Sequence, residues 1–461
     1  MDHAEQVRRL EQKPVGQLLW EFSIPAIAAT VVNASHGIIN RIFVGQTIGE
    51  VGIAAITVTF PIITIMLAFG MTIGIGANTL ISIRLGEKKN QEAEQIVGLA
   101  LFLFVIFAAG FMVFGLLFQE PLLKLFSTSD RVMEHAKQYL TVMVCGAFFH
   151  EMSFGVNSFL RSEGKPHTAM FTTLIMVALN ILFDYLFLFV FHTDIWGAAL
   201  ATILAQICST SWVFWHYISG NTLLRWRLKY FRWNSTLAKE VFLLGMPPFI
   251  MQIVTCLIQI IQLRQIMYYG DLYGKAHGFE HGGDIAVSAF GIIFVIWLLT
   301  IFPILGINQG AQPIIGYNYG AGHFSRVRKA MMLSNYAVAA FAVVSTAVLL
   351  IFPEIILSVF GNDEKMLSLA CRATRISVCL LATAGPAIVM SGYFQAIGDA
   401  KTAIALTLIR QIVFLLPVLL ILPYFFGLDG VWASMPVSDL LTLFITLSLL
   451  RRELKKLDNL L

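Results

Sequence analysis

Four residues interrupt one long apolar run at helical spacing, and they include an imidazole and two amides that can form hydrogen bonds to a ligand. The run covers residues 22–45, and Asn33, His36, Gly37 and Asn40 recur in it at intervals of three and four. On a helix this spacing places them on one face. Unpaired polar groups in hydrocarbon cost several kcal/mol each. We therefore expect this face to look into protein or into a water-filled cavity.

A second candidate group lies in the apolar run over residues 168–191. Asn180 and Asp184 are one helical turn apart and share a face. A lone carboxylate in hydrocarbon is expensive, so Asp184 should be paired, hydrated or protonated, which suits a residue that exchanges protons. Both runs cross in the same direction, which puts Asn40 and Asp184 at a similar depth. We predict that these two residues face each other in the outer part of the N-terminal half, where Asp184 could exchange protons.

Five polar residues around that site have two interpretations. Asn33, His36, Asn157, Asn180 and Thr202 all fit a substrate or coupling network. Asn, Thr and His side chains also commonly hydrogen-bond helices together, contributing roughly 0.6 kcal/mol each. The sequence favours neither reading for Asn157, Asn180 and Thr202, and for His36 it favours the structural one.

The elements that must position these residues are membrane-spanning helices. Of 461 residues, 57% are hydrophobic and 13% are charged, against about 25% charged in ordinary soluble domains. The net charge of +4 is small, so we expect no nucleic-acid partner. Five cysteines lie in apolar runs without metal-ligand spacing, and no metal site or cofactor is expected. The chain is predicted to be an all-α polytopic membrane protein whose main partner is the lipid bilayer.

Twelve segments are long enough to span a bilayer. They cover residues 17–44, 51–82, 93–118, 133–159, 168–191, 196–218, 239–269, 284–314, 327–352, 368–394, 402–424 and 430–450. An even number places both termini on one side. That side carries 21 Lys and Arg residues against 8 on the other. Both termini are therefore predicted to be cytoplasmic, in a multi-pass protein of the cell (inner or plasma) membrane.

The two halves of the chain repeat each other. Residues 76–78 (Gly-Ala-Asn) match residues 310–312 (Gly-Ala-Gln), and Gly164 matches Gly398, each at an offset of 234 positions. A constant offset indicates two six-helix bundles that arose by duplication, and they enter the membrane in the same direction. The predicted division is an N-terminal bundle at 1–224, a basic cytoplasmic linker at 225–238 and a C-terminal bundle at 239–461.

With these motifs in order, the chain resembles the multidrug and toxic compound extrusion (MATE) transporters, in particular their DinF branch. The resemblance rests on Asn-Arg-Ile-Phe-Val-Gly at 40–45, Gly-Ile-Gly-Ala-Asn at 74–78, Arg-Ser-Glu-Gly-Lys-Pro at 161–166 and Asn-Ile-Leu-Phe-Asp at 180–184, and it extends over nearly the whole chain. It implies a cation-coupled exporter of cationic or lipophilic xenobiotics that works by alternating access, is not an enzyme and functions as a monomer.

One residue departs from the family pattern. The resemblance implies an aspartate at position 40, which loads and releases the coupling proton, but this sequence has Asn40. Asn has nearly the shape of Asp and does not titrate, so it imitates a permanently neutral carboxyl. We interpret it as an engineered Asp-to-Asn change that impairs coupling. Natural drift, or a coupling residue elsewhere, are the alternatives.

The coupling ion and the cargo have rival interpretations. Gln262 aligns with Asn40 in the second half. The seventh and tenth predicted spans, at 239–269 and 368–394, carry no carboxylate deep inside them, which favours protons over sodium as the coupling ion. Arg410 is placed near a helix end, snorkelling or paired, and Asp439 lies inside the last span with no partner that the sequence identifies. A lipid-linked-substrate flippase of related architecture is another alternative, although the spans contain few of the cations that would hold a pyrophosphate.

Overall fold

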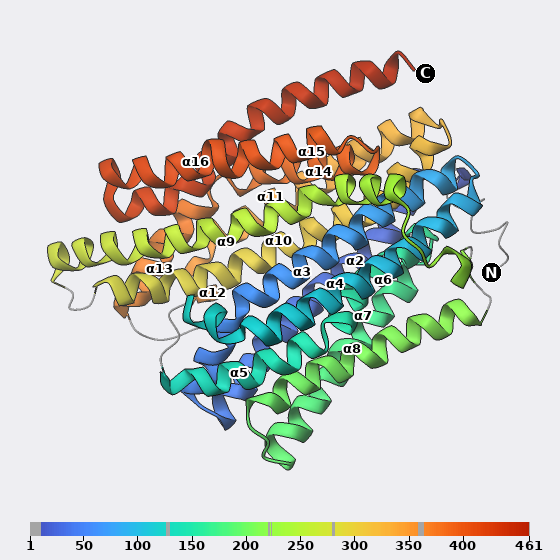
Figure 1. The fold of residues 1–461 in the computed structure, drawn as a ribbon. Coiled ribbons are helices and arrows are strands. Elements are labelled where there is room, and N and C mark those ends of the chain that lie inside the picture. Colours follow the sequence, from blue (N-terminus) through green and yellow to red (C-terminus); the bar gives the residue numbers. More distant parts are fainter. Residues whose placement is uncertain are drawn as a thin grey trace.

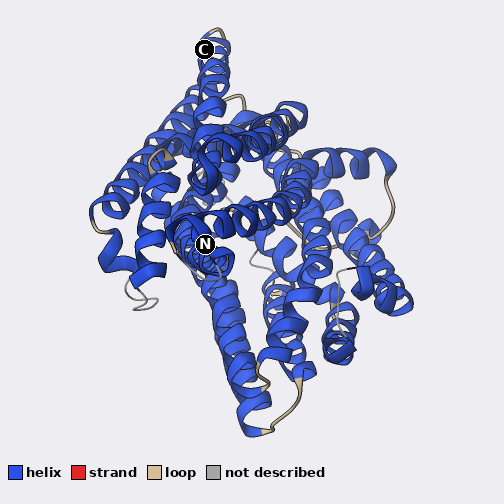
Figure 2. Ribbon diagram, turned by 90° about the vertical axis from the view of Figure 1, so that its left-hand side faces the viewer, coloured by secondary structure: helices blue, strands red, loops and turns tan. Residues whose placement is uncertain are grey.

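The computed structural model describes residues 11–125, 130–219, 222, 224–278, 282–357 and 364–460. Within these ranges the chain is almost entirely helical and contains no strand (Figure 2). Long apolar segments form helices in a membrane because only an internally hydrogen-bonded backbone satisfies its polar groups there. The prediction of an all-α membrane protein is confirmed.

The helices fall into two sets in chain order. The N-terminal half contains α2 (Val15–Thr47), α3 (Glu50–Gly86), α4 (Asn90–Leu125), α5 (Asp130–Cys145), α6 (Ala147–Ser162), α7 (Pro166–Asp184), η1 (Tyr185–Val190) and α8 (Ile195–Ile218). After the short η2 (Leu228–Tyr230), the C-terminal half contains α9 (Ser235–His277), α10 (Gly282–Gly320), α11 (Phe324–Ile351), α12 (Pro353–Leu357), α13 (Glu364–Val378), η4 (Leu381–Thr383), α14 (Ala384–Ala396), α15 (Ala400–Leu408), η5 (Ile409–Leu415) and α16 (Leu416–Asp458).

Twelve crossings account for these helices. Within the described ranges, ten helical segments are long and apolar enough to span, and α5 and α6 form an eleventh span that bends by 54°. The segment over residues 400–458 is too long for one crossing and supplies the twelfth, because it reverses at Gly427, where φ is 57° and ψ is −136°. Ser438 Oγ donates to the carbonyl of Arg410 at 3.1 Å, a contact that requires the chain to double back.

The duplication recurs in the backbone. Left-handed φ angles occur at Lys88 (62°) and Gly322 (73°), 234 positions apart, and at Gly164 (80°) and Gly398 (86°), again 234 apart. The bend between α5 and α6 at residue 146 has its counterpart in the break between α13 and α14 at residues 379–383. Turns and bends at matched positions make the two halves pseudo-symmetric, as the repeat predicted.

The two halves join at the end of the molecule that carries both chain termini, here called the terminus end (Figure 1). α2 packs along α10, and α3 packs along α9. A side chain at Gly76 would place its Cβ 2.0 Å from the carbonyl oxygen of Val241, and one at Gly310 would lie 2.8 Å from the backbone of Ser23. Glycine at these positions lets the helix backbones touch.

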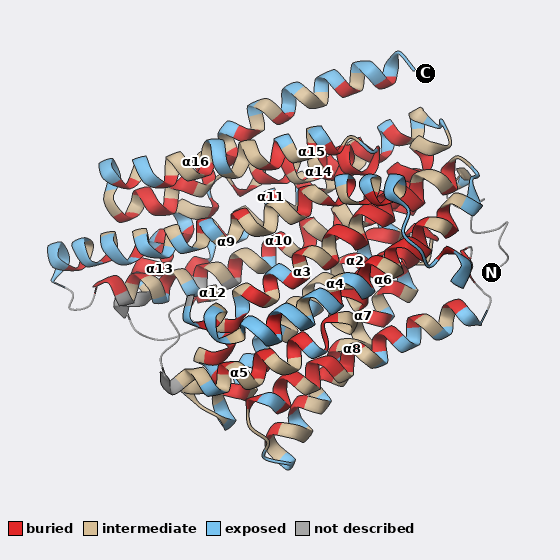
Figure 3. Ribbon diagram, viewed as in Figure 1, coloured by how far each residue is buried: buried red, intermediate tan, exposed pale blue. Residues whose placement is uncertain are grey.

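Toward the opposite end, here called the far end, the same helices separate. Gly37 on α2 and Gly291 on α10 have open space where a side chain would project. Two hydrophobic clusters occupy this region, and each is built from one half only, whereas the largest cluster, toward the terminus end, combines residues of both halves. In Figure 3 the buried residues gather toward the terminus end. The molecule is therefore closed at the terminus end and open between the halves at the far end.

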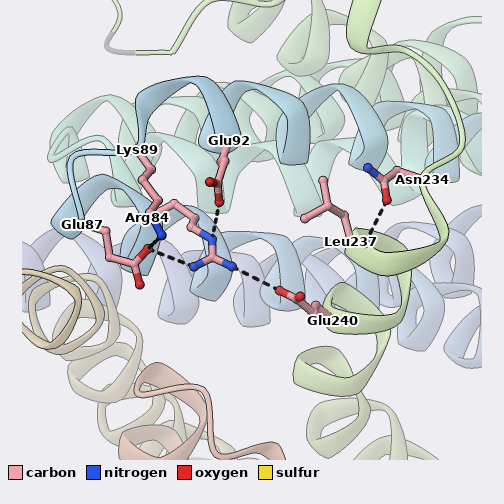
Figure 4. A network of polar contacts seen from close by, with 7 residues as sticks. All are labelled: Arg84, Glu87, Lys89, Glu92, Asn234, Leu237 and Glu240. Atoms are coloured by element: carbon pink, nitrogen blue, oxygen red, sulfur yellow. Dashed lines mark hydrogen bonds and ion pairs between the residues drawn. The ribbon is translucent and has the colours of Figure 1, made fainter.

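An ion-pair network ties the halves together at the terminus end (Figure 4). Arg84 contacts Glu87 at 2.9 Å and Glu92 at 3.0 Å, and it reaches Glu240 on α9 at 3.5 Å. Burial acts to raise the pKa of the Glu87 carboxyl, but hydrogen bonds from Lys89 and Arg84 outweigh it and hold that pKa below its usual value. Close by, the Asn234 side chain accepts from the N–H of Leu237 at 3.2 Å. This cap starts α9 at Ser235, four residues before the predicted start.

Candidate functional site

Asp184 is fully buried at the last residue of α7, in the N-terminal half. The helix continues from this residue as the six-residue π-helical segment η1. A π-helical turn shifts the hydrogen-bond register and is frequent at functional sites. One carboxylate oxygen, Oδ1, has no hydrogen-bond partner among the described residues. The sequence places this carboxyl deep in a predicted span, and the structure buries its side chain completely.

Asn180 lies at the centre of the polar contacts around Asp184. In the amide orientation that satisfies its neighbours, its nitrogen donates to Asp184 Oδ2 at 3.1 Å and to His36 Nε2 at 2.9 Å. Its oxygen accepts from the Thr202 hydroxyl at 3.3 Å. Asn180, Thr202 and His36 come from α7, α8 and α2, so one amide connects three helices to the carboxyl. These four residues are called the Asp184 network below.

His36 has a defined tautomer in this network. Its ring hydrogen-bonds the backbone of Asn33 one turn earlier on α2, where only a carbonyl is free to accept. Since Nε2 accepts from Asn180, the ring N–H must be on Nδ1. A neutral imidazole in this tautomer holds the Asn180 amide with its nitrogen toward Asp184. His36 thus positions the amide that contacts the carboxyl.

Asn40 lies on α2 at the depth of Asp184. α2 and α7 run in parallel, with His36 beside Asn180 and the ring of Phe43 5.3 Å from that of Phe189, centroid to centroid. Asn40 falls between these two contacts and is buried. Position 40 and Asp184 are thereby on neighbouring helices at matched height. No hydrogen bond to the Asn40 side chain is formed by any residue that the structure describes.

Two predicted residues lie outside the network. Asn33 is exposed, and only its backbone takes part. The four polar positions of α2 form an arc roughly 100° wide, with His36 and Asn40 against α7 and Asn33 and Gly37 facing open space. Asn157 instead bonds the Ala169 carbonyl at 2.9 Å and the Thr173 hydroxyl at 3.0 Å. Thr173 is seven residues, about 10 Å, before Asn180 along α7, so Asn157 forms a separate contact between α6 and α7.

Sequence reasoning did not select other polar residues of the same half. Gln206, one turn from Thr202 on α8, hydrogen-bonds His150 Nδ1 at 2.9 Å. Tyr139 on α5 lies within electrostatic range of Asp184 and is buried. Glu151 on α6 has 0% exposure. Two signals in the sequence could have identified them. Gln206 is four residues from Thr202 and so shares its helix face, and Glu151 is a carboxyl inside an apolar run.

The C-terminal half contains a different arrangement. Arg410 Nε donates to Asp439 Oδ1 at 2.8 Å, with side-chain exposures of 16% and 9%. Arg410 is in η5, inside the hairpin of the last two spans, and not at a helix end as the sequence suggested. The reversal at Gly427 brings the two residues together, which supplies the partner that the sequence did not reveal for Asp439. Gln262, the position that aligns with Asn40, is half-buried on α9.

The chemistry available at the Asp184 network is proton binding. It offers one carboxyl, one neutral imidazole, one amide and one hydroxyl in a buried setting, and no nucleophile paired with a base. Among the described residues, no group of three or more His, Cys, Asp and Glu side chains is arranged to hold a metal ion. A buried carboxyl beside a rigid amide can hold a proton or release it when its surroundings change.

Comparisons with known proteins agree with this architecture. The sequence profile of the MatE family matches residues 25–186 and 279–421. The multidrug export protein MepA of Staphylococcus haemolyticus is 25% identical over 97% of each chain. The MATE multidrug transporter DinF-BH, solved in complex with a ligand, is 34% identical, covers 96% of both chains and has a TM-score of 0.84.

A further structure supports the fold alone. The outward-facing conformation of a multidrug resistance MATE family transporter is 21% identical and superimposes with a TM-score of 0.90 over 100% of this chain and 99% of the other. The matched family consists of transporters and not of enzymes. The protein is thus a multi-pass membrane transporter of the MatE family, to which these multidrug exporters also belong.

Proposed function

We propose that this chain exports cationic or lipophilic drugs in exchange for protons, with Asp184 as the residue that binds the coupling proton. The names of its relatives, a multidrug export protein and a multidrug transporter, support the cargo class. The DinF branch is the proposed subgroup, and the protein acts as a monomer because one chain contains both halves. It requires no cofactor.

The observation that carries this proposal is the buried carboxyl of Asp184 held by Asn180. No cation is paired with it among the described residues, and Oδ1 has no partner. An ionised carboxylate in this position would lose several kcal/mol of hydration without an opposite charge to replace it. It therefore holds a proton in this conformation and releases it when water or cargo reaches it.

The open far end supports a route for the cargo. The halves meet at the terminus end and separate toward the far end, beside the exposed face of Asn33 and Gly37. With both termini in the cytoplasm, this is the outward-open state. The bundles over residues 1–224 and 239–461 rock about the segment at 225–238 in this proposal. Drug leaves through the far end as protons enter.

Asn40 lowers the proton coupling of this chain. It stands at the depth of Asp184, where a carboxyl would bind a second proton. An amide cannot titrate, so one proton-binding group is missing and the N-terminal half is biased toward its protonated shape. Restoring the carboxyl at position 40 is expected to raise the transport rate.

Sodium coupling and lipid-linked cargo are less well supported. Asp439, a buried carboxylate within the last span of the C-terminal half, is already neutralised by Arg410. A sodium site there would have to displace a hydrogen-bonded guanidinium. A flippase would need several free Lys or Arg side chains between the halves to hold pyrophosphate. Arg410, which lies within a span, is instead paired with Asp439.

The test is transport of ethidium, a fluorescent lipophilic cation, by everted membrane vesicles under an imposed pH gradient or an imposed sodium gradient. Four chains are compared: the protein itself, Asn40→Asp, Asp184→Asn, and Asn40→Asp combined with Asp184→Asn. We expect a pH gradient to drive Asn40→Asp about tenfold faster than either chain that lacks Asp184, equivalent to about 1.4 kcal/mol. The sodium gradient should have no effect.

Two results would contradict the proposal. Equal pH-driven transport with and without Asp184 would remove the role given to that carboxyl. Transport that follows the sodium gradient at constant pH would move the coupling site away from the Asp184 network.

A further inference from the structure

Glu151 is a second buried carboxyl in the N-terminal half, outside the Asp184 network. It lies on α6 with 0% exposure, and neither of its carboxylate oxygens has a hydrogen-bond partner in the described part of the chain. Its backbone is pressed against α3, where a Cβ at Gly70 would lie 3.2 Å from the Glu151 Cα. Gly70 leaves the space that the Glu151 side chain needs.

An ionised Glu151 would be very unfavourable in this place. Moving an unpaired carboxylate out of water costs several kcal/mol even after relaxation. No hydrogen bond to either carboxylate oxygen offsets this cost among the described residues. The group is therefore neutral here, with a proton on one oxygen.

The ionisable groups on the surrounding helices lie near helix ends or contact other residues. His150, the preceding residue, points to Gln206 on α8. The acidic and basic residues of α3 and α4 lie at the helix ends, as Arg84 and Glu120 do, and that of α8 is His216 in its last turn. On α7 and α2, Asp184 and His36 are engaged with Asn180. α5 contributes Tyr139, besides Glu134, His135 and Lys137 in its first half, and α10 contributes Tyr317, which bonds Glu11 at the terminus end.

The fold itself does not require a carboxyl at this point. At the offset of 234, Glu151 corresponds to Gly385 on α14, and Gly70 corresponds to Ile304 on α10. Ile304 has 0% exposure and lies in an apolar cluster with Val338, which a Cβ on Gly385 would approach to 2.4 Å. The C-terminal half thus fills the equivalent contact with hydrocarbon. A packing role does not explain the acid in the N-terminal half.

Glu151 lies near a bend in its span and at a close contact between two helices. The span bends by 54° at residue 146, five residues before Glu151. Beyond it, α6 contacts α3 through glycine backbones, and a Cβ at Gly74 would fall 2.6 Å from the Gly155 Cα. A change of this bend, or a shift of α6 along α3, would change the access of water to the carboxyl between them.

We propose that Glu151 is a second proton-binding residue of the transport cycle, with Gly70 and the bend at residue 146 controlling its access to water. The proposal rests on the proton-coupled function above. In the cycle the Glu151 carboxyl gives its proton to water on one side, becomes a carboxylate, and takes a proton from water on the other side. This chain then retains two proton-binding carboxyls, Asp184 and Glu151, although position 40 is an amide.

The test counts protons released when ethidium binds to the detergent-purified full chain in weak buffer. The variants are Glu151→Gln and Asp184→Asn, and Glu134→Gln on α5 is the matched control, because Glu134 is exposed. We expect each of the first two changes to remove about half of the released protons and the control to remove none. Release that is unchanged in Glu151→Gln but reduced in Asp184→Asn would overturn the proposal and leave the proposed function intact.

A second measurement needs no variant and covers the case in which Glu151→Gln fails to fold. A hydrophobic carbodiimide modifies protonated carboxyls in apolar sites, and mass spectrometry of the labelled chain locates them. We expect label on Glu151 at neutral pH and less label after ethidium is added. Label on Asp184 with none on Glu151 would overturn the proposal. Absence of any proton release by the unmodified chain would instead overturn the proposed function, together with the proton-binding role that rests on it.

Discussion

The two halves of the protein have the same backbone fold, but the partners of the buried carboxyls compared here differ between them. Both carry a bend in their fourth span and left-handed turns at matched positions. In the N-terminal half, Asp184 and Glu151 are buried without a cation among the described residues. In the C-terminal half, Asp439 is bound to Arg410. The comparison teaches that duplication preserved the scaffold, while the surroundings of the buried carboxyls diverged between the two copies.

The largest expected effect comes from breaking the C-terminal ion pair. Asp439→Asn leaves Arg410 buried without its counter-ion, which should cost about 3–5 kcal/mol of stability. The yield of folded protein and its thermal midpoint in detergent measure this loss. The double change Arg410→Met with Asp439→Leu should recover most of it, because no charge then remains buried. Loss of pH coupling at normal stability would contradict the structural role assigned to this pair.

The matched glycines test whether the scaffold, unlike the charges, responds alike in both halves. Gly76→Ala and Gly310→Ala each push a methyl group into the facing backbone at the terminus end. We expect each to destabilise that closed interface by about 1–3 kcal/mol. Gly37→Ala at the open far end is the control and should have little effect on stability. Crosslinking of α3 to α9 reports the contact at Gly76, and crosslinking of α10 to α2 reports the contact at Gly310. A response at only one of the two glycines would contradict the expected symmetry of the scaffold.

Removing the amide that holds Asp184 should affect function more than stability. Asn180→Leu leaves His36 and Asp184 without their shared partner. In the Asn40→Asp background we expect pH-driven ethidium transport to fall about tenfold, equivalent to about 1.4 kcal/mol. Asn157→Leu, whose contacts are elsewhere between α6 and α7, should change stability by roughly 0.6 kcal/mol. Equal loss of transport in both variants would show that Asn157 belongs to the same functional site as Asn180.

The smallest expected effect concerns the network at the terminus end. Arg84→Gln removes the contacts to Glu87, Glu92 and Glu240, and such ion pairs near the surface contribute about 0–1 kcal/mol. The folded pKa of Glu87 is lowered, so its contribution is present above its unfolded pKa and is lost as the pH falls through the folded value. The destabilisation by Arg84→Gln should thus be measurable at neutral pH and should shrink in acid. A loss that grows in acid would reverse the sign assigned here.

Much of the fold follows from local patterns, which the sequence contains. Apolar length predicted the spans, and a constant offset predicted the duplication. The non-helical break at Gly427 falls between the predicted spans at 402–424 and 430–450. The predicted helix start at residue 239 was four residues late, because the cap from Asn234 acts outside the apolar pattern. Among the site residues, Asn40, His36, Asn180, Asp184 and Thr202 lie together, and Asn157 does not.

By itself, the sequence determined the membrane class, the twelve crossings, the repeat and the polar arc on α2. These depend on composition and on helical periodicity, which act over a few turns of one segment. Only the tertiary structure decided that Asn180 links Asp184 to His36, that Arg410 neutralises Asp439 and that Glu151 has no partner among the residues described. The physical reason is that such contacts depend on the rotation and height of one helix against another. Close packing between distant segments sets both quantities, and no local pattern records them.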